Sequence, residues 1–154
     1  MSKSERRYHR KTGARCFNQA WDYLVKKKRT VKDDMRMLNL AHASAYHWSL
    51  VGSPRNRAVG EWQISRIYGA IGEPRLALQF AKSSLEICQK NGLADIVHTA
   101  NEAMARAHAI GEDYAMAEKY LSKARIQLDK LTLDKEDREI FWEQFHETEK
   151  LIRR

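Results

Sequence analysis

Apolar side chains recur every three or four positions along most of this sequence of 154 residues, as they do in helices with one buried face. The first such stripe consists of Phe17, Trp21 and Leu24, and it ends near a run of basic residues at 26–29. A new stripe begins after Thr30, and others follow along the rest of the chain. The pattern therefore predicts an all-α protein.

Turn and cap residues divide this pattern into about seven helices. Ser53-Pro54 places a hydroxyl cap before a proline at the first helical position, and Glu73-Pro74 restarts the chain after a turn. With only 7 Gly and 2 Pro, the connections are short, so consecutive helices should pack antiparallel. The other expected helix ends and starts are Thr30, Gly52, Gly72, Asn91-Gly92, Gly111, Asp113 and Asp134.

Residues in the middle of the chain recur at an offset of 40 positions. Small residues in such a pattern let two helices approach closely, while large ones fill the space beside them. The turn motif Gly72-Glu73 also has a counterpart in Gly111-Glu112-Asp113-Tyr114. The matched pairs are Ile64 with Met104, Ser65 with Ala105, Tyr68 with His108, Ala77 with Ala117, Ala81 with Leu121, and Ser84 with Ala124.

This pattern resembles the tetratricopeptide repeat (TPR). The resemblance is best over residues 58–128, with a period longer than the ~34 residues usual in that family. A degenerate first repeat is expected at residues 14–51. The resemblance implies a right-handed stack of antiparallel helix pairs, a TPR-like α-solenoid, in which the first helix of each pair lines a concave groove.

The chain is expected to form one helical domain, residues 14–154, after a basic N-terminal arm at residues 1–13. The arm has no apolar face and should be mobile. Residues 134–152 should form a C-terminal capping helix with an acidic outer face, as an exposed end helix requires. The acidic residues of that face are Glu136, Glu139, Glu143, Glu147 and Glu149.

Composition places the chain among cytoplasmic proteins. Cys16 and Cys88 are too few and too far apart for a disulfide framework, and we expect them to be reduced thiols in the core. No stretch approaches the ~18 apolar residues of a membrane span. The basic amino terminus is not followed by the apolar run of a secretory signal. No membrane partner is expected.

The net charge of +8 is concentrated near the amino terminus. Residues 1–32 contain eleven basic and two acidic residues, a net charge of +9, and the remainder carries −1. Such asymmetry indicates either a solvated tail or a surface for an anionic partner. The densest candidate for binding anions is the run Lys26, Lys27, Lys28 and Arg29.

The offset of 40 also relates charged residues that would line the groove. Lys26, Arg66 and Arg106 form one such series, and Trp62 and Glu102 belong to a second that begins at Asp22. The first series would be a cationic ladder suited to carboxylates or phosphates. Alternatively, Arg66 and Arg106 are exposed, or they pair with Glu61 and Glu102 in their own helices.

Motifs for chemistry are absent. His42 and His47 are five residues apart, so they point about 140° apart around a helix and are poorly placed to share a metal. We therefore predict no metal site, no cofactor and no catalytic residue. A small-ligand pocket lined by His42, Tyr46 and Glu61 remains a candidate.

These observations favour a non-enzymatic scaffold that binds an unidentified protein or acidic peptide in its concave groove. One alternative is nucleic-acid binding through residues 1–32, where aromatic side chains lie among the basic ones. A second alternative is a ligand sensor or enzyme with a pocket near His42–Trp62.

Overall fold

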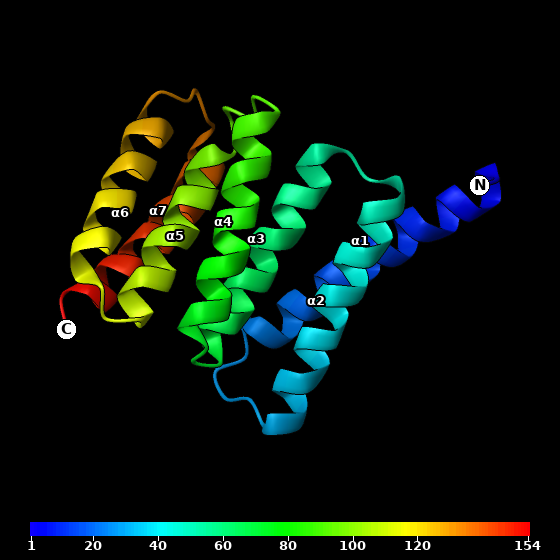
Figure 1. The fold of residues 1–154 in the computed structure, drawn as a ribbon, viewed down its shortest axis with the longest axis horizontal. Coiled ribbons are helices and arrows are strands. Elements are labelled where there is room, and N and C mark those ends of the chain that lie inside the picture. The colour runs from blue at the N-terminus through cyan, green and yellow to red at the C-terminus, as the bar shows by residue number, and fades with distance from the viewer.

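The computed structural model describes residues 1–154 and contains seven α-helices and no strand, which confirms the all-α prediction (Figure 1). None of these helices combines the length and the apolar composition that crossing a lipid bilayer requires. The helices are α1 (Lys3–Leu24), α2 (Val31–Val51), α3 (Pro54–Ala70), α4 (Pro74–Lys90), α5 (Val97–Ile110), α6 (Tyr114–Asp129) and α7 (Lys135–Ile152).

Local capping residues set most of the helix starts, as the sequence predicted. The Thr30 side chain accepts a hydrogen bond from the Asp33 amide, and the Asp33 carboxylate accepts one from the Thr30 amide. Ser53 and Asn56 form the same reciprocal cap before α3. Caps of this kind satisfy backbone amides that have no partner within the helix, and each typically stabilises it by about 1 kcal/mol. Asp134 caps α7 through the Asp137 amide.

The start of α1 differs from the expectation. Residues 1–13 were expected to be a basic arm, but the chain is helical from Lys3 onward. Ser2 accepts from the Glu5 amide at 3.1 Å, and the Glu5 carboxylate accepts from the Ser2 amide at 2.6 Å. This capping box starts the helix without help from apolar packing. The amino-terminal end of α1 projects beyond the other helices at one end of the molecule (Figure 1).

Consecutive helices form the closest contacts, in the pairs α1–α2, α3–α4 and α5–α6. The pairs follow one another along the molecule, with α2 against α3 and α4 against α5 (Figure 1). The last helix, α7, packs mainly against α5 and only slightly against α6, to which it is joined. It therefore lies against the first helix of the α5–α6 pair.

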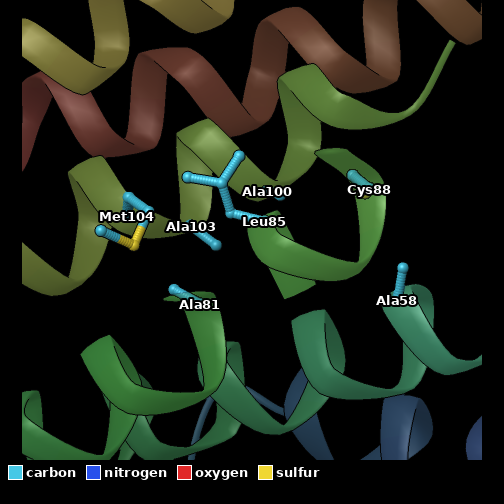
Figure 2. Close-up of a cluster of buried hydrophobic side chains, with 7 residues drawn as sticks. All are labelled: Ala58, Ala81, Leu85, Cys88, Ala100, Ala103 and Met104. Carbon is cyan, nitrogen blue, oxygen red and sulfur yellow. The ribbon is translucent and has the colours of Figure 1, made fainter. Parts of the chain in front are cut away.

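Alanine dominates the contacts between helices. The cluster at the centre of the molecule joins α3, α4 and α5 (Figure 2), and four of its seven members are alanines. Small side chains allow the helix backbones to approach closely, and Leu85 and Met104 fill the remaining space. The buried side chains of this cluster are Ala58, Ala81, Leu85, Cys88, Ala100, Ala103 and Met104.

The turns after α3 and α5 have the same hydrogen bonds at an offset of 40 residues. The Glu73 amide donates to Tyr68 O, and the Asp113 amide donates to His108 O, both at 2.9 Å. The residues with positive φ in the two turns are Gly72 (82°) and Glu112 (63°). Gly72 therefore corresponds to Glu112, and not to Gly111.

Candidate binding groove between α1, α3, α5 and α7

A hollow of about 600 Å³ lies between the four helices α1, α3, α5 and α7. Its floor carries two arginines and its walls are largely apolar, so it combines charge with hydrophobic surface. The lining residues are Trp21, Leu24, Val25, Arg66, Gly69, Ala70, Arg106, Ile110, Ile140, Glu143, Gln144, Glu147 and Leu151. We refer to this hollow as the groove.

Two arginines, one from α3 and one from α5, meet one glutamate from α7 in the groove. Arg66 Nη2 donates to Glu147 Oε2 at 3.3 Å, and Arg106 Nη2 donates to the same oxygen at 3.0 Å. The Glu147 side chain is 57% exposed, whereas those of Arg66 and Arg106 are 10% and 15% exposed. The carboxylate of Glu147 thus covers the two guanidinium groups from the solvent side.

A second carboxylate, Glu102 on α5, lies beneath the arginines and is fully buried. Arg106 Nε donates to Glu102 Oε1 at 3.2 Å, and Arg66 Nη1 lies 3.7 Å from Glu102 Oε2. The hydroxyl of Thr148 on α7 donates to Glu102 Oε1 at 2.5 Å. Two cations and two anions therefore balance in one cluster, as burial of charge requires.

The surroundings shift the pKa values of three groups in this cluster. Burial lowers the pKa of Arg66, and the charge of Arg106 lowers it further. Burial also opposes the charge of Arg106, but Glu102 and Glu147 outweigh it and raise the pKa of that residue. Burial would raise the pKa of Glu147, but its contacts with Arg106 and Arg66 lower it overall. The ionised form of Glu147 thus depends on both arginines.

Two tryptophans form an aromatic platform beside Arg66. The rings of Trp21 and Trp62 are stacked, with their centroids 5.6 Å apart. The Arg66 guanidinium lies 5.7 Å from the Trp21 centroid and 5.5 Å from that of Trp62, within the range of cation–π attraction. Gln63 donates to Phe17 O at 2.9 Å, which fixes α3 against α1 at this point. The platform is therefore held in place from both helices.

The structure brings together four of the five residues predicted for the groove, namely Trp62, Arg66, Glu102 and Arg106. Lys26 does not join them, because α1 ends at Leu24 and the turn directs Lys26 toward Asp33, 3.3 Å away. The groove is lined at this point by Val25. The expected cationic ladder therefore has two members.

The residues of the predicted small-ligand pocket contact different neighbours. His42 Nε2 lies 3.2 Å from Tyr68 Oη, and burial lowers the pKa of His42. Tyr46 is 62% exposed and lies beside His47. Burial raises the pKa of Glu61, with a partly opposing contribution from Ser83 on α4. Each of the three predicted residues therefore has its own neighbours.

Half of the predicted anion-binding run has a structural role. Arg29 Nε donates to Asp34 at 2.7 Å, and its other nitrogens donate to the carbonyl groups of Leu24 and Ala70 at 3.3 Å. Lys26 pairs with Asp33. The side chains that remain exposed without a carboxylate partner are Lys27 and Lys28.

Sequence reasoning missed several contributors to the groove, among them Trp21, Glu147 and Thr148. Trp21 was assigned to an apolar stripe and to the aromatic side chains that lie among the basic residues of 1–32. Glu143, Glu147 and Glu149 were expected on the outer face of the last helix, which is wrong: Glu143 and Glu147 line the groove, and Glu149 pairs with Arg125 on α6. Helical periodicity could not distinguish Glu147 from the other glutamates of α7, since its role depends on where the whole helix packs.

No protein-family model, curated protein or solved structure matches this chain. No group of three or more His, Cys, Asp or Glu side chains converges in the way that metal ligands do. What the groove offers chemically is two guanidinium groups, an aromatic platform and apolar walls. Guanidinium groups recognise carboxylates through paired hydrogen bonds, and the apolar walls suit the aliphatic parts of a peptide.

Proposed function

We propose that this protein is a TPR-like binding scaffold whose groove takes an acidic segment of a partner protein. The helix pairs α3–α4 and α5–α6, with their matching turns, support the view that the chain is a right-handed stack of repeats. In such a stack the first helices line the concave side, where α1, α3 and α5 border the groove. Most of the apolar lining residues come from these three helices.

The observation that carries this proposal is the position of Glu147 between Arg66 and Arg106. These arginines occupy positions 40 residues apart, on equivalent helices, and both donate to one carboxylate oxygen. The groove thus already holds a glutamate on an amphipathic helix, supplied by the chain itself. A partner's glutamate, on a helix with apolar neighbours, has the same chemistry.

Glu147 would compete with such a partner. It is the most exposed member of the cluster, and it leaves Glu102 behind to neutralise part of the charge when it moves away. A partner's carboxylate would then form the two hydrogen bonds that Glu147 gives up. Removing the charge of Glu147 should therefore strengthen binding, because the partner no longer displaces an internal ligand.

Fluorescence anisotropy tests this proposal. The probe is a labelled amphipathic helical peptide with glutamates on one face and leucines on the other, titrated with the full chain. We expect Glu147→Gln to bind it about 5–10-fold more tightly than the wild type, the size of a typical coupling between sites. Glu143→Gln is the matched control, since Glu143 lines the same groove without an ion pair.

Arg106→Lys supplies the converse test. The lysine keeps the positive charge but lacks the planar fork of N–H groups with which Arg106 reaches Glu102 through Nε and a second carboxylate through Nη2, so the peptide should bind more weakly. Circular dichroism establishes whether this variant keeps its helices. Equal binding by the wild type, Glu147→Gln and Arg106→Lys would overturn the proposal. So would equal binding of a peptide with lysines in place of its glutamates.

A further inference from the structure

The part of α1 from Lys3 to Arg15 carries six basic side chains that no carboxylate neutralises. All six are exposed, and none forms an ion pair. At 100° per residue they cover about half of the helix circumference, opposite the buried Thr12 and Cys16. We call this surface the basic stripe; it consists of Lys3, Arg6, Arg7, Arg10, Lys11 and Arg15.

The basic side chains of the stripe have no carboxylate partner, unlike the arginines of the groove. The one acidic residue nearby, Glu5, holds the Ser2 amide in the helix cap. In the groove, by contrast, Arg66 and Arg106 are balanced by two glutamates. An external anion should therefore be attracted more strongly to the basic stripe than to the arginines of the groove.

Exposed aromatic rings border the stripe where α1 meets α2. Tyr8 is 60% exposed and Tyr46 is 62% exposed. The ring of His47 lies between them, with its centroid 5.9 Å from that of Tyr8 and 5.7 Å from that of Tyr46. Tyr8 also precedes Lys11 by three positions, so the two share a face of α1. Rings and cations thus adjoin on one surface.

A hydrogen bond between two histidines holds this surface together. Nδ1 of His9 on α1 lies 2.7 Å from Nδ1 of His47 on α2, so one ring donates and the other accepts. The Ser44 hydroxyl donates to Gly13 O at 2.8 Å one helical turn further along. These contacts fix the position of α1 relative to the exposed rings of α2.

We propose that the basic stripe and the adjoining tyrosines bind single-stranded nucleic acid. Arginine and lysine would contact successive phosphates, while unstacked bases pack on Tyr8 and Tyr46. An anionic membrane surface fits less well, since a helix lying on lipid presents large apolar side chains and the stripe has none. This site differs from the groove in its residues and its helices, and it does not depend on the function proposed for the groove.

A salt titration with the full chain tests the site. The probes are a labelled single strand of 20 uridines and a duplex of the same length. For a single strand, the logarithm of the association constant should fall by about 0.7 per contacted phosphate for each tenfold increase in salt. Six contacts therefore give a slope no steeper than about −4. The single strand should bind more tightly than the duplex.

Two triple variants with the same change in charge separate the stripe from net charge. Arg7→Gln/Arg10→Gln/Lys11→Gln should weaken binding at least tenfold and reduce the slope by about 2, which corresponds to three phosphates. Lys27→Gln/Lys28→Gln/Lys32→Gln removes three exposed charges elsewhere, and it should weaken binding by less than about threefold, because only long-range attraction is lost. Tyr8→Ala and Tyr46→Ala should each weaken binding about fivefold or more, with the slope unchanged.

Several results would overturn this inference. Equal losses in the two triple variants would show that net charge alone attracts the strand. Preference for the duplex, or unchanged affinity in both tyrosine variants, would overturn the stacking contacts. Stripe-dependent binding to phosphatidylserine vesicles without binding to the single strand would identify a membrane surface. Loss of affinity in Arg106→Lys would place the site in the groove.

Discussion

The hydroxyl of Thr148 lies 2.5 Å from Oε1 of Glu102, and both side chains are fully buried. Thr148 lies on α7 and Glu102 on α5, and the two residues are 46 positions apart in the sequence. Glu102 thereby receives a hydrogen bond from the last helix in addition to the one from Arg106. One carboxylate thus joins the end helix to the middle of the molecule, close to the groove.

Replacing Glu102 with glutamine should therefore destabilise the fold strongly. The amide keeps the shape of the side chain but leaves Arg66 and Arg106 with one carboxylate between them in a buried place. Breaking a buried ion pair from one side costs about 3–5 kcal/mol. Chemical denaturation of Glu102→Gln measures this loss.

The matched control for Glu102→Gln is Glu139→Gln on α7. Glu139 pairs with Lys135 at 3.8 Å, and both side chains are well exposed, so this change should cost less than about 0.5 kcal/mol. Equal and small losses in the two variants would show that Glu102 is not held by its charge.

His98 should make the fold sensitive to acid. It is fully buried, and burial lowers its pKa to about 4, because this effect outweighs the contacts with Asp95 and Glu102, which raise the pKa. The unfolded chain has the ordinary pKa of about 6.5 and so binds more protons between these values. The free energy of unfolding should thus fall by about 3 kcal/mol as the pH drops from 7 toward 4.

The contribution of His98 can be isolated by comparing how stability changes with pH in two variants. In His98→Leu the decrease between pH 7 and pH 4 should be smaller by that amount, whatever the variant's stability at pH 7. His146→Gln replaces an exposed histidine and should keep the wild-type decrease. The same decrease in all three proteins would contradict the prediction.

The helix starts were readable from the sequence because caps are local. Thr30 and Asp33 are three residues apart, and their reciprocal hydrogen bonds involve nothing else. The early start of α1 has the same kind of signal in Ser2 and Glu5, but the apolar periodicity that usually accompanies it is missing there. Residues 3–11 carry mainly charge, since most of them face solvent.

The role of α7 was not readable, because it depends on tertiary packing. Phe145 inserts into a cluster with Ala105 and Leu121, and this fixes which side of α7 faces α5. Only that placement brings Glu147 to Arg66 and Arg106. Tertiary packing also sets the register of α1 against α3. Trp62 stacks on Trp21, whereas the offset of 40 residues pairs Trp62 with Asp22, one position later.

Arg29 should contribute more to the stability of the fold than its position in a run of basic residues suggests. Its guanidinium donates to Asp34 and to carbonyl groups at the ends of α1 and α3, so it connects three helices. Hydrogen bonds to charged groups contribute about 1.5–3 kcal/mol each when well formed. Arg29→Gln should lower the free energy of unfolding by about 2 kcal/mol, measured by urea denaturation.

Lys28→Gln is the control for Arg29→Gln, since it removes the same charge from an exposed neighbour. It should change stability by less than about 0.5 kcal/mol. If both variants lose the same small amount, the three hydrogen bonds of Arg29 do not stabilise the fold.

The turns after α3 and α5 give opposite predictions for how glycine affects stability at the position with positive φ. Gly72 has a φ of 82° with open space around it, so Gly72→Ala should cost about 1 kcal/mol through backbone strain alone. Glu112 holds the equivalent conformation, with a φ of 63°, and Glu112→Gly should stabilise the protein by up to about 1 kcal/mol. Gly111 has an ordinary φ of −82° and room for a methyl group, so Gly111→Ala should be neutral or slightly stabilising. Thermal unfolding of the three variants measures these differences. A loss of stability in Gly111→Ala as large as that in Gly72→Ala would mean that Gly111, and not Glu112, is the counterpart of Gly72.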